Sequence, residues 1–364
     1  MSDPQSLDDE AVGIMKRKQE GIDIPLNRDV QAKTTSTFLE YVKLVHDAIP
    51  ELNLSDVDTT TSFLGRKFSA PLIIDSMTGG TEKALLINGR LAELAESYSL
   101  PMGVGSQRAG LVSEKLADSY TIARKNAPNA FLIANIGGAQ LSAGLSVEKV
   151  KRLIDMISAD ALVVHLNPLQ ELVQPEGEPR YSGVLRCISD LVKIIGVPVI
   201  AKEVGAGISG EAALKLSEVG VSAINVAGAG GTSWAGVEKV RAESASERLK
   251  TRLGELFWDW GIPTALSILV VRRMLTKLPL IASGGIRNGL EIAKCITIGA
   301  DMCAMAYPFL VNAVQSKEAL YQFADTVIAE LKSTMFLVGA ADISTLKCTK
   351  YILTGELLSE ANEY

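Results

Sequence analysis

The polar residues most able to do chemistry lie in the stretch VHLNPLQELVQPEGEP, residues 164–179. The chain of 364 residues has only two histidines, and His165 is followed here by Asn167, Gln170 and Glu171. A lone histidine after an apolar run is most simply a core residue whose ring hydrogen-bonds a backbone carbonyl. Because this one is grouped with two amides and a carboxylate, we interpret the stretch as a binding or catalytic site.

A single carboxylate limits the metal chemistry of this stretch. Glu171 alone would hold a transition metal poorly, but one carboxylate together with substrate phosphates is a common way to bind Mg²⁺. The four cysteines are scattered without a CxxC pair, so we expect no zinc cluster and reduced, mostly buried thiols. There is no Ser/His/Asp order and no cysteine with a positioned base, which argues against covalent acyl chemistry.

Two glycine-rich segments have the composition of phosphate-binding loops. SGGIRNG, residues 283–289, follows an apolar run and precedes a helical pattern. Its glycines allow close approach of the backbone, and the helix N-terminus favours an anion. Arg287 adds a guanidinium that matches phosphate geometry. A simple tight turn is the alternative for the two glycines alone. AGAGGT, residues 227–232, is a weaker second loop that we expect beside the first.

Further hydrogen-bond donors stand at the ends of other apolar runs. Lys202 ends the run PVIAK, and a lysine at that place needs a partner. The partner is either a carboxylate on an adjacent strand or a phosphate or ring atom of a ligand. Ser106 and Arg108 in GSQR and Asn135 in FLIANI occupy comparable places. Together these residues indicate one large, polyanionic and partly planar ligand.

The elements that must position these residues are eight short apolar runs that alternate with helical patterns. A nearly continuous apolar run is typical of a parallel strand covered on both faces. The runs are residues 71–76, 101–106, 131–136, 161–166, 198–203, 222–227, 279–284 and 302–307. Helical periodicity is found in residues 82–98, 146–158 and 209–220, and Ser146 and Ser209 suit helix starts.

This alternation predicts an α/β fold, a (β/α)8 TIM barrel over about residues 70–340. An open doubly wound sheet is the alternative. The barrel is favoured because glycines or polar residues follow nearly every run, and a barrel places all those strand ends on one rim.

Three further segments complete the predicted organisation around a catalytic barrel of residues 71–340. Residues 1–70 form an N-terminal extension that covers the bottom of the barrel or packs across a neighbour, and that contributes to the substrate site. A long insertion, residues 228–262, follows the sixth strand; its charged part, 238–252, should be a solvated helix face, and its aromatic part could be core or lid. Residues 341–364 form a C-terminal tail helix.

The composition is that of a folded cytoplasmic enzyme. The net charge is −6 with a pI near 5.3, and no basic run is present, so we expect no nucleic-acid partner. The mean hydropathy is +0.21, yet no apolar stretch approaches the ~20 residues that span a bilayer. The apolar balance therefore suggests a large core or buried subunit interfaces. The start, MSDPQSLDDE, has no apolar core like that of a signal peptide.

Taken together, the motifs resemble those of the type 2 isopentenyl diphosphate isomerases, which are FMN-dependent (β/α)8 enzymes. The resemblance covers about residues 15–340, and HLNPLQE, QPEG and GVGSQR are far more specific than a glycine-rich loop. The motifs that carry it are RKQE (17–20), STFL (36–39), MTGG (77–80), GVGSQR (103–108), ANIG (134–137), HLNPLQE (165–171), QPEGEP (174–179), KEVGAGIS (202–209), GAGGTSW (228–234) and SGGIRNG (283–289).

The resemblance implies a role for each matching residue. The FMN-binding residues would be Met77, Thr78, Gly79, Ser106, Asn135, Lys202, Thr232, Gly284, Gly285, Ile286, Arg287, Ala306 and Tyr307. The diphosphate substrate would be bound by Arg17, Lys18, Ser106, Gln107, Arg108 and Gln170. The catalytic residues at the reacting end would be Gln170, His165 and Asn167, with Gln170 orienting the alkene, and Glu171 would hold Mg²⁺.

The implied activity belongs to isoprenoid biosynthesis. Isopentenyl diphosphate would become dimethylallyl diphosphate by a reduced-FMN-assisted 1,3-allylic proton shift with no net redox. NADPH would serve as the reductant, and the protein would be a homotetramer or homo-octamer. The alternative is an FMN-dependent oxidoreductase of the 2-hydroxy-acid oxidase type on the same barrel, although no arginine follows His165 closely. A third hypothesis is a ligand-binding relative without turnover.

Two positions depart from the family pattern. The motif RKxEH ends in histidine, but this chain has Gly21 there. We therefore expect one polar contact fewer near the diphosphate. The loop after the sixth strand usually has serine where this chain has Ala227, which predicts one hydroxyl contact fewer to FMN.

Overall fold

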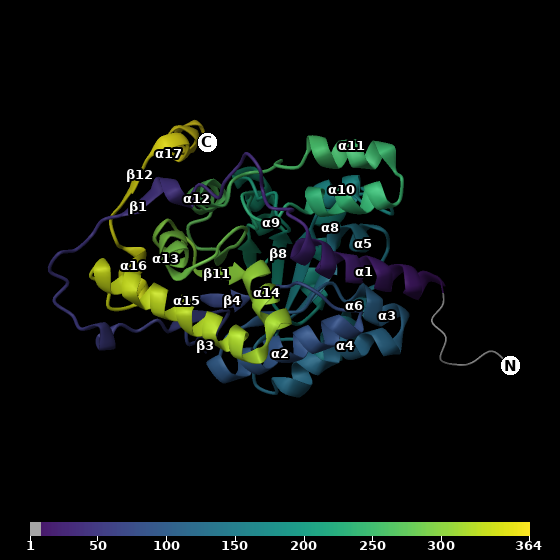
Figure 1. The fold of residues 1–364 in the computed structure, drawn as a ribbon, viewed down its shortest axis with the longest axis horizontal. Helices are drawn as coiled ribbons and strands as arrows, with labels where there is room; N and C mark the ends of the chain where they lie inside the picture. Colours follow the sequence, from purple (N-terminus) through teal and green to yellow (C-terminus); the bar gives the residue numbers. More distant parts are fainter. Residues whose placement is uncertain (1–8) are drawn as a thin grey trace.

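Eight parallel strands form a closed barrel at the centre of the computed structural model, which describes residues 9–364 (Figure 1). Each strand lies within one of the predicted runs, except that the third extends one residue beyond its run, to Gly137, so the (β/α)8 prediction is confirmed and the open sheet is wrong. In their order around the barrel the strands are β4 (Leu72–Ile74), β5 (Met102–Gly103), β6 (Leu132–Gly137), β7 (Ala161–Leu166), β8 (Val199–Glu203), β9 (Ala223–Asn225), β10 (Leu280–Ala282) and β11 (Met302–Met305), after which β11 pairs with β4.

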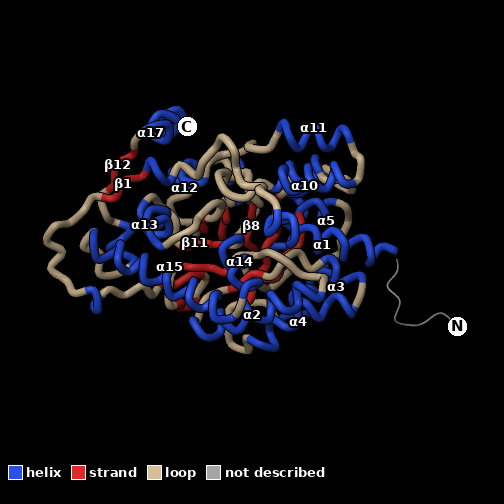
Figure 2. The backbone as a smooth tube through the Cα atoms, in the orientation of Figure 1, coloured by secondary structure: helices blue, strands red, loops and turns tan. Residues whose placement is uncertain are grey.

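Helices surround the strands, as Figure 2 shows in blue around red. The three predicted helical segments are α2, α6 and α9, and the Ser146 and Ser209 side chains cap the last two by accepting from Lys149 N and Ala212 N. The outer helices are α2 (Glu82–Tyr98), α4 (Glu114–Asn126), α6 (Val147–Ile157), α8 (Val184–Ile194), α9 (Gly210–Glu218), α12 (Thr264–Met274), α13 (Gly289–Thr297) and α15 (Lys317–Leu337). Shorter helices follow strand ends: α3 (Arg108–Val112), α5 (Gly138–Ser142), α7 (Pro168–Val173) and α14 (Tyr307–Gln315).

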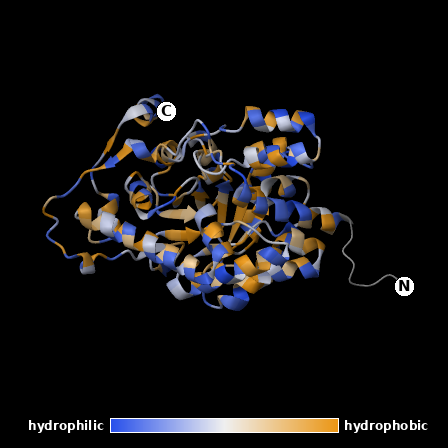
Figure 3. Cartoon of the chain, viewed as in Figure 1, coloured by the Kyte–Doolittle hydropathy of each residue, from blue (hydrophilic) through white to orange (hydrophobic). Residues whose placement is uncertain are grey.

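The inside of the barrel is built in layers because successive strand side chains point to opposite faces. Outward-facing strand residues join the helices in one large core, and the strands are the most hydrophobic part of the chain (Figure 3). An inner apolar layer includes Ile73, Ile133, Val163, Ile200 and Ile281. Two residues further along each strand, the same face is polar. These residues are Asp75, Asn135, His165, Lys202 and, at the corresponding point of β10, Ser283.

The N-terminal extension covers both ends of the barrel. The hairpin of β2 (Thr61–Phe63) and β3 (Arg66–Phe68) inserts Phe63 and Phe68 into the inner apolar layer, where Phe68 packs edge-on against Phe131. Helix α1 (Asp9–Asn27) lies instead beside the rim, against α3 and α10. The expectation of a covered bottom therefore describes the hairpin but not α1. The acidic start, residues 1–8, lies outside the described residues.

The C-terminal tail contains more than the expected helix. Helices α16 (Ile343–Lys347) and α17 (Gly355–Glu363) flank a short strand, β12 (Tyr351–Leu353), which pairs antiparallel with β1 (Val42–Leu44) beside the barrel (Figure 1). Residues 351–353 read YIL, and such aromatic and β-branched side chains favour a strand. Two 3₁₀ turns, η1 (Leu39–Tyr41) and η2 (Leu54–Asp56), complete the extension. Among the described residues, no helix is long and apolar enough to cross a bilayer.

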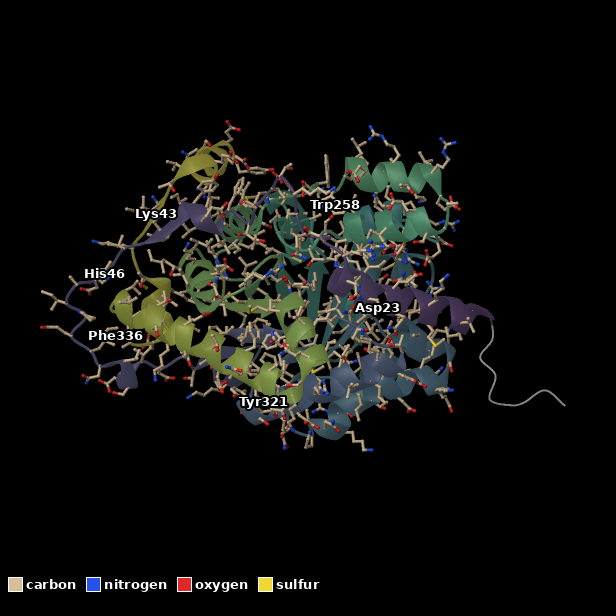
Figure 4. The ribbon with its side chains drawn as sticks, in the orientation of Figure 1. Asp23, Lys43, His46, Trp258, Tyr321 and Phe336 are labelled. Carbon is tan, nitrogen blue, oxygen red and sulfur yellow. The ribbon has the colours of Figure 1, made fainter. Side chains whose placement is uncertain are left out.

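The insertion after β9 forms two helices, α10 (Trp234–Ser244) and α11 (Arg248–Leu256). The prediction of a solvated charged face is wrong for α10, because Glu238 and Arg241 are buried where α10 packs between α11, α7 and α1. In the aromatic part of the insertion, one tryptophan belongs to the core and another is exposed. Trp258 is buried and donates from Nε1 to Gln31 O at 2.9 Å, whereas Trp260 is 64% exposed (Trp258 is labelled in Figure 4).

Candidate active site

The carboxyl ends of the barrel strands surround a cavity of about 250 Å³. All but two of the predicted site residues line it: Arg17, Lys18, Met77, Thr78, Ser106, Arg108, Asn135, His165, Asn167, Gln170, Glu171, Lys202, Thr232, Gly284, Gly285, Ile286, Arg287, Ala306 and Tyr307. The exceptions are Gln107 and Gly79. The side chain of Gln107 is fully buried, donates to Leu153 O and accepts from Asn135 N, so it supports the wall from behind. Gly79 packs against the Tyr120 ring, which a Cβ would overlap.

The two glycine-rich loops lie backbone to backbone at one side of the cavity, as expected. A Cβ on Gly231 would come within 2.5 Å of Gly285 N, and one on Gly284 within 2.1 Å of Gly228 O. Only glycine permits this approach, and Gly284 also has a φ of 98°. Arg287 lies over the Tyr307 ring at 5.2 Å, and burial lowers the pKa of its guanidinium. This side of the cavity is suited to a phosphate group.

Lys202 points into the barrel and pairs with the carboxylate of Asp75, with Nζ and Oδ2 3.0 Å apart. Both side chains are 8% exposed. Of the two partners expected for Lys202, a carboxylate on an adjacent strand or a ligand atom, the structure shows a carboxylate, but Asp75 follows β4, which lies across the barrel from β8. The interior of a barrel brings together side chains from strands that are not neighbours in the sheet. Considering only adjacent strands therefore overlooks this pair. The pair places a cation in the cavity floor.

His165 is a neutral imidazole in this site. Burial lowers its pKa to about 3, and the charges of Lys18, Lys202 and Arg17 act in the same direction. Its Nδ1 lies 2.7 Å from Asn135 Oδ1, and Asn135 donates its own Nδ2 to Val104 O. Because the amide oxygen must accept, Nδ1 carries the hydrogen and Nε2 is left as an acceptor. His165 therefore offers a lone pair, not a proton, near neutral pH.

The amides that follow β7 form a hydrogen-bonded chain. Tyr181 donates its hydroxyl to Asn167 Oδ1 at 2.7 Å, and Asn167 Nδ2 donates to Gln170 Oε1 at 3.2 Å. Gln170 Nε2 then donates to Glu238 Oε1 at 2.8 Å. Both ends of the Gln170 amide are thus fixed, and its orientation at the cavity is defined.

Glu171 is buried and held by donors. Its Oε1 accepts from Asn167 Nδ2 at 3.3 Å, and its Oε2 accepts from Gln174 Nε2 at 2.8 Å and from Glu178 N at 3.1 Å. Within residues 9–364 there is no group of three or more His, Cys, Asp or Glu side chains that could hold a metal ion. A cation at Glu171 would therefore need ligands from a bound substrate.

Three cations face the cavity from α1 and α3. They are Arg17, Lys18 and Arg108. Lys18 donates to Ser106 O at 2.9 Å, and burial lowers the pKa of its amine to about 7, assisted by Arg17 and Arg108. Among the described residues, neither Arg17 nor Lys18 has a carboxylate within ion-pair distance, whereas Arg108 approaches only Glu10, at 3.6 Å. Such a cluster is suited to a multiply charged anion.

Two buried hydroxyls at the end of β4 have no hydrogen-bond partner within the described structure: Ser76 Oγ and Thr78 Oγ1. Buried polar atoms are almost always paired. Both residues line the cavity, so a polar ligand beside β4 would supply the missing partners. With Lys202, Asn135 and the glycine loops, these atoms fit a ligand that has both a polar ring system and a phosphate, as FMN has.

The structure adds site residues that the sequence did not identify. Asp75, Ser76, Trp234, Glu238 and Arg241 all line the cavity. Ser76 directly precedes the MTGG motif and Trp234 ends GAGGTSW. Their place in or beside these motifs could have identified both as site residues. Glu238 and Arg241 were hidden in a charged run that is usually solvated.

The two departures from the family pattern also lie at the cavity. Gly21 faces it from α1, and a Cβ there would meet only the Trp234 ring, at 3.9 Å. Ala227 lines it with a φ of 39° and accepts a hydrogen bond from Gly207 N. The space beside Gly21 is therefore open to a side chain or to substrate.

Comparison with known proteins gives one consistent result. Residues 181–352 match the family described as FMN-dependent dehydrogenase. The isopentenyl-diphosphate delta-isomerase of Nostoc sp. (strain PCC 7120) is 50% identical over 331 residues, 91% of this chain and 93% of that protein. That of Methanosarcina acetivorans is 45% identical over 340 residues, 93% of this chain and 92% of that protein.

Solved structures extend the likeness in fold. A mandelate oxidase mutant with the monooxide FMN adduct has a TM-score of 0.64 and 14% identity, over 94% of this chain and 100% of that one. Mandelate oxidase with (S)-2-phenylpropionate has a TM-score of 0.63 and 14% identity, over 94% and 98%. At this identity the likeness concerns the fold alone.

Proposed function

This chain belongs to the isopentenyl-diphosphate delta-isomerase family, in its FMN-dependent type 2 form, and we propose that it converts isopentenyl diphosphate to dimethylallyl diphosphate. The observation that carries the proposal is that cations from two different sets of elements line one cavity. Arg287 and the glycine loops belong to the ends of β9 and β10, whereas Arg17, Lys18 and Arg108 belong to α1 and α3. Two phosphate-bearing ligands, a cofactor and a substrate, would account for both.

FMN would be held by the residues at the strand ends. Its phosphate suits Arg287 and the loops at Gly231 and Gly284, and its ring suits Asn135, Lys202 and the unpaired hydroxyls of Ser76 and Thr78. When bound and reduced, FMN supplies an electron-rich ring that can exchange protons with an alkene.

The protein's own groups at the reacting end bind and orient. Gln170 is fixed between Asn167 and Glu238, so its amide can position the alkene. Neutral His165 cannot act as an imidazolium acid, and its Nε2 can accept a hydrogen bond. Ile22, Pro25 and Trp234 give the cavity an apolar wall that suits a prenyl chain. A 1,3-allylic proton shift in such a site needs no net oxidation.

At the other end, the diphosphate would be neutralised by Arg17, Lys18 and Arg108. We assign Mg²⁺ to Glu171, and diphosphate oxygens and water would supply its other ligands. The support for this is the position of Glu171 on the cavity wall, next to the amides of Asn167 and Gln174.

Further assignments follow from the chemistry. The isomerisation moves no electrons overall, so a reductant such as NADPH is needed only to bring the flavin to its reduced form. The four thiols are unpaired, which is the usual state in a reducing cytoplasm, and we place the protein there, in isoprenoid biosynthesis. We also propose a homotetramer or homo-octamer, as the resemblance to the type 2 isomerases implies.

The oxidase alternative has no support in the site. Its structural relatives share only 12–16% identity with this chain, and His165 is paired with an amide, not with a carboxylate that would raise its basicity.

The direct test is anaerobic incubation of reduced, FMN-loaded protein with isopentenyl diphosphate and Mg²⁺, followed by product analysis. We expect dimethylallyl diphosphate over many turnovers without consumption of reductant. Full turnover by oxidised protein without any reductant, or oxidation of a 2-hydroxy acid in place of isomerisation, would overturn the proposal.

A further inference from the structure

Arg241 on α10 is surrounded by three carboxylates from three different elements. Its Nε lies 2.7 Å from Glu20 Oε2 on α1, and its Nη1 lies 2.6 Å from Glu238 Oε2 on α10. Its Nη2 lies 2.6 Å from Glu176 Oε1, in the loop that follows α7. The Arg241 side chain is 8% exposed. One guanidinium therefore joins parts of the chain that are 65 or more residues apart.

Two chains of contacts, here called arms, start from Arg241. The first arm runs through Glu238 to Gln170, at the reacting end of the cavity. Glu238 is 2% exposed, and its two oxygens divide their contacts between Arg241 and Gln170. Burial raises the pKa of Glu238, and Arg241 opposes that shift. Without the guanidinium, Glu238 would be an uncompensated buried carboxylate that takes up a proton or turns away. Either change alters the acceptor that fixes the Gln170 amide.

The second arm leads to the diphosphate end. Glu20 lies within two or three residues of Lys18 and Arg17, on the same helix. Other polar contacts that hold α1 are Lys18 Nζ to Ser106 O, Glu10 to Arg108 at 3.6 Å, and Asp23 to Lys83 at 2.7 Å (Asp23 is labelled in Figure 4). The Asp23–Lys83 pair is 41% and 32% exposed, so solvent weakens it. Among the described residues, the Glu20–Arg241 pair is the most buried of the ion pairs that hold this helix.

We propose that Arg241 is a positioning residue that couples the two ends of the active site. Through Glu238 it fixes the Gln170 amide beside the alkene, and through Glu20 it holds α1, with Arg17 and Lys18, beside the diphosphate. Glu176 balances the remaining face of the guanidinium and ties the loop after α7 to the same point. The proposal rests on the isomerase function, because it assigns roles to groups that act on that substrate.

The two arms can be separated by substitution. Glu20→Gln removes only the arm to α1, so the KM for isopentenyl diphosphate should rise about tenfold with kcat changed less than about threefold. Arg241→Met removes both arms, so the same rise in KM should be joined by a fall in kcat of at least about tenfold. Arg241→Lys keeps a charge at this place and should recover part of the lost kcat, though without the forked contact.

Lys239→Met is the matched control, because it removes a cation from the same helix. Lys239 pairs with Glu243 at 2.7 Å on the side away from the cavity. We expect wild-type kcat and KM for this variant. Thermal unfolding and FMN content of each protein establish that the variants are folded, and Glu20→Gln and Arg241→Lys remain informative if Arg241→Met does not fold.

The outcomes separate the two proposals. If the wild type forms no dimethylallyl diphosphate, the proposed function fails. If the wild type is active but Arg241→Met or Arg241→Lys behaves like Lys239→Met, the positioning role is wrong and the function stands. The positioning role is equally wrong if Glu20→Gln lowers kcat as much as the Arg241 variants do, because the two arms would then not be separate.

Discussion

Lys202 and Asp75 form an ion pair across the inside of the barrel, with their charged atoms 3.0 Å apart and both side chains almost fully buried. The pair stands directly above the apolar layer of Ile73 and Ile200. The pair therefore lies at the boundary between the apolar core of the barrel and the polar cavity.

Removing one member of this pair should be costly. Asp75→Asn leaves the Lys202 amine buried without its counter-charge, and we expect the free energy of unfolding of the FMN-free protein to fall by about 3 kcal/mol. Urea unfolding measures this. Asp190→Asn breaks an exposed pair with Lys193 and should cost less than about 1 kcal/mol. Equal losses in the two variants would contradict the role given to Asp75.

Lys18 should make substrate binding depend on pH. The pKa of its amine is lowered to about 7 by burial, with Arg17 and Arg108 adding to the effect. The amine is charged below that pH and loses its proton above it, so the affinity for isopentenyl diphosphate should fall as pH rises from 6 to about 9. In Lys18→Arg the charge persists, and this decline should be absent. Titration calorimetry of both FMN-loaded proteins isolates the amine, because ionisation of the ligand is common to both.

Removing the unpaired hydroxyl of Thr78 should leave stability equal or higher but lower the affinity for FMN. Thr78→Val removes a buried, unsatisfied oxygen, so the FMN-free protein should be as stable as the wild type or more stable by up to about 1 kcal/mol. FMN affinity should fall several-fold because a ligand contact is lost. Thermal unfolding and flavin fluorescence titration measure the two effects. A loss of stability with unchanged FMN affinity would show that Thr78 is only structural.

Gly21 should limit both the stability of α1 and the binding of substrate. A glycine inside a helix costs roughly 0.5–1 kcal/mol relative to alanine, so Gly21→Ala should stabilise the protein by up to that amount. Gly21→His should lower the KM for isopentenyl diphosphate by adding a donor beside the cations of α1. The Cβ of either residue fits, with Trp234 at 3.9 Å.

Gly13 provides the control for this substitution. It lies on the same helix, is exposed, and has no atom within 4 Å of its would-be Cβ. Gly13→Ala should raise stability to a similar extent without any change in KM. A KM that is unchanged in Gly21→His would show that the space beside Trp234 does not meet the diphosphate end.

The barrel could be predicted from the sequence because its signals are local. Each strand is a short apolar run, and Ser146 and Ser209 mark helix starts within a few residues of the helices they cap. The site residues at the strand ends could then be predicted from the fold, because a barrel places the carboxyl ends of all its strands on one rim. Arg17 and Lys18 of α1 were predicted only from the RKQE motif. Hydrophobic periodicity alone does not indicate that α1 lies at the rim of the barrel.

What remained unpredictable depends on contacts between distant segments. Arg241 looks like part of a solvated helix face until α1 and the loop after α7 pack against it. Gln107 stands among cavity residues in sequence, yet its side chain turns outward to Leu153. Asp75 finds its partner across the barrel, a relationship set by closure of the sheet. None of these leaves a periodic pattern.

The pairing of β1 with β12 has a consequence for how the molecule is made. The partners of residues 42–44 are residues 351–353, which follow only after about 300 further residues have been synthesised. At ~5–20 residues per second this delay is on the order of tens of seconds. Throughout that interval residues 42–44 lack the strand that pairs with them, and an unpaired strand edge can pair with other chains. All eight barrel strands precede β12 in the chain, so the barrel can close around its core before β1 is paired.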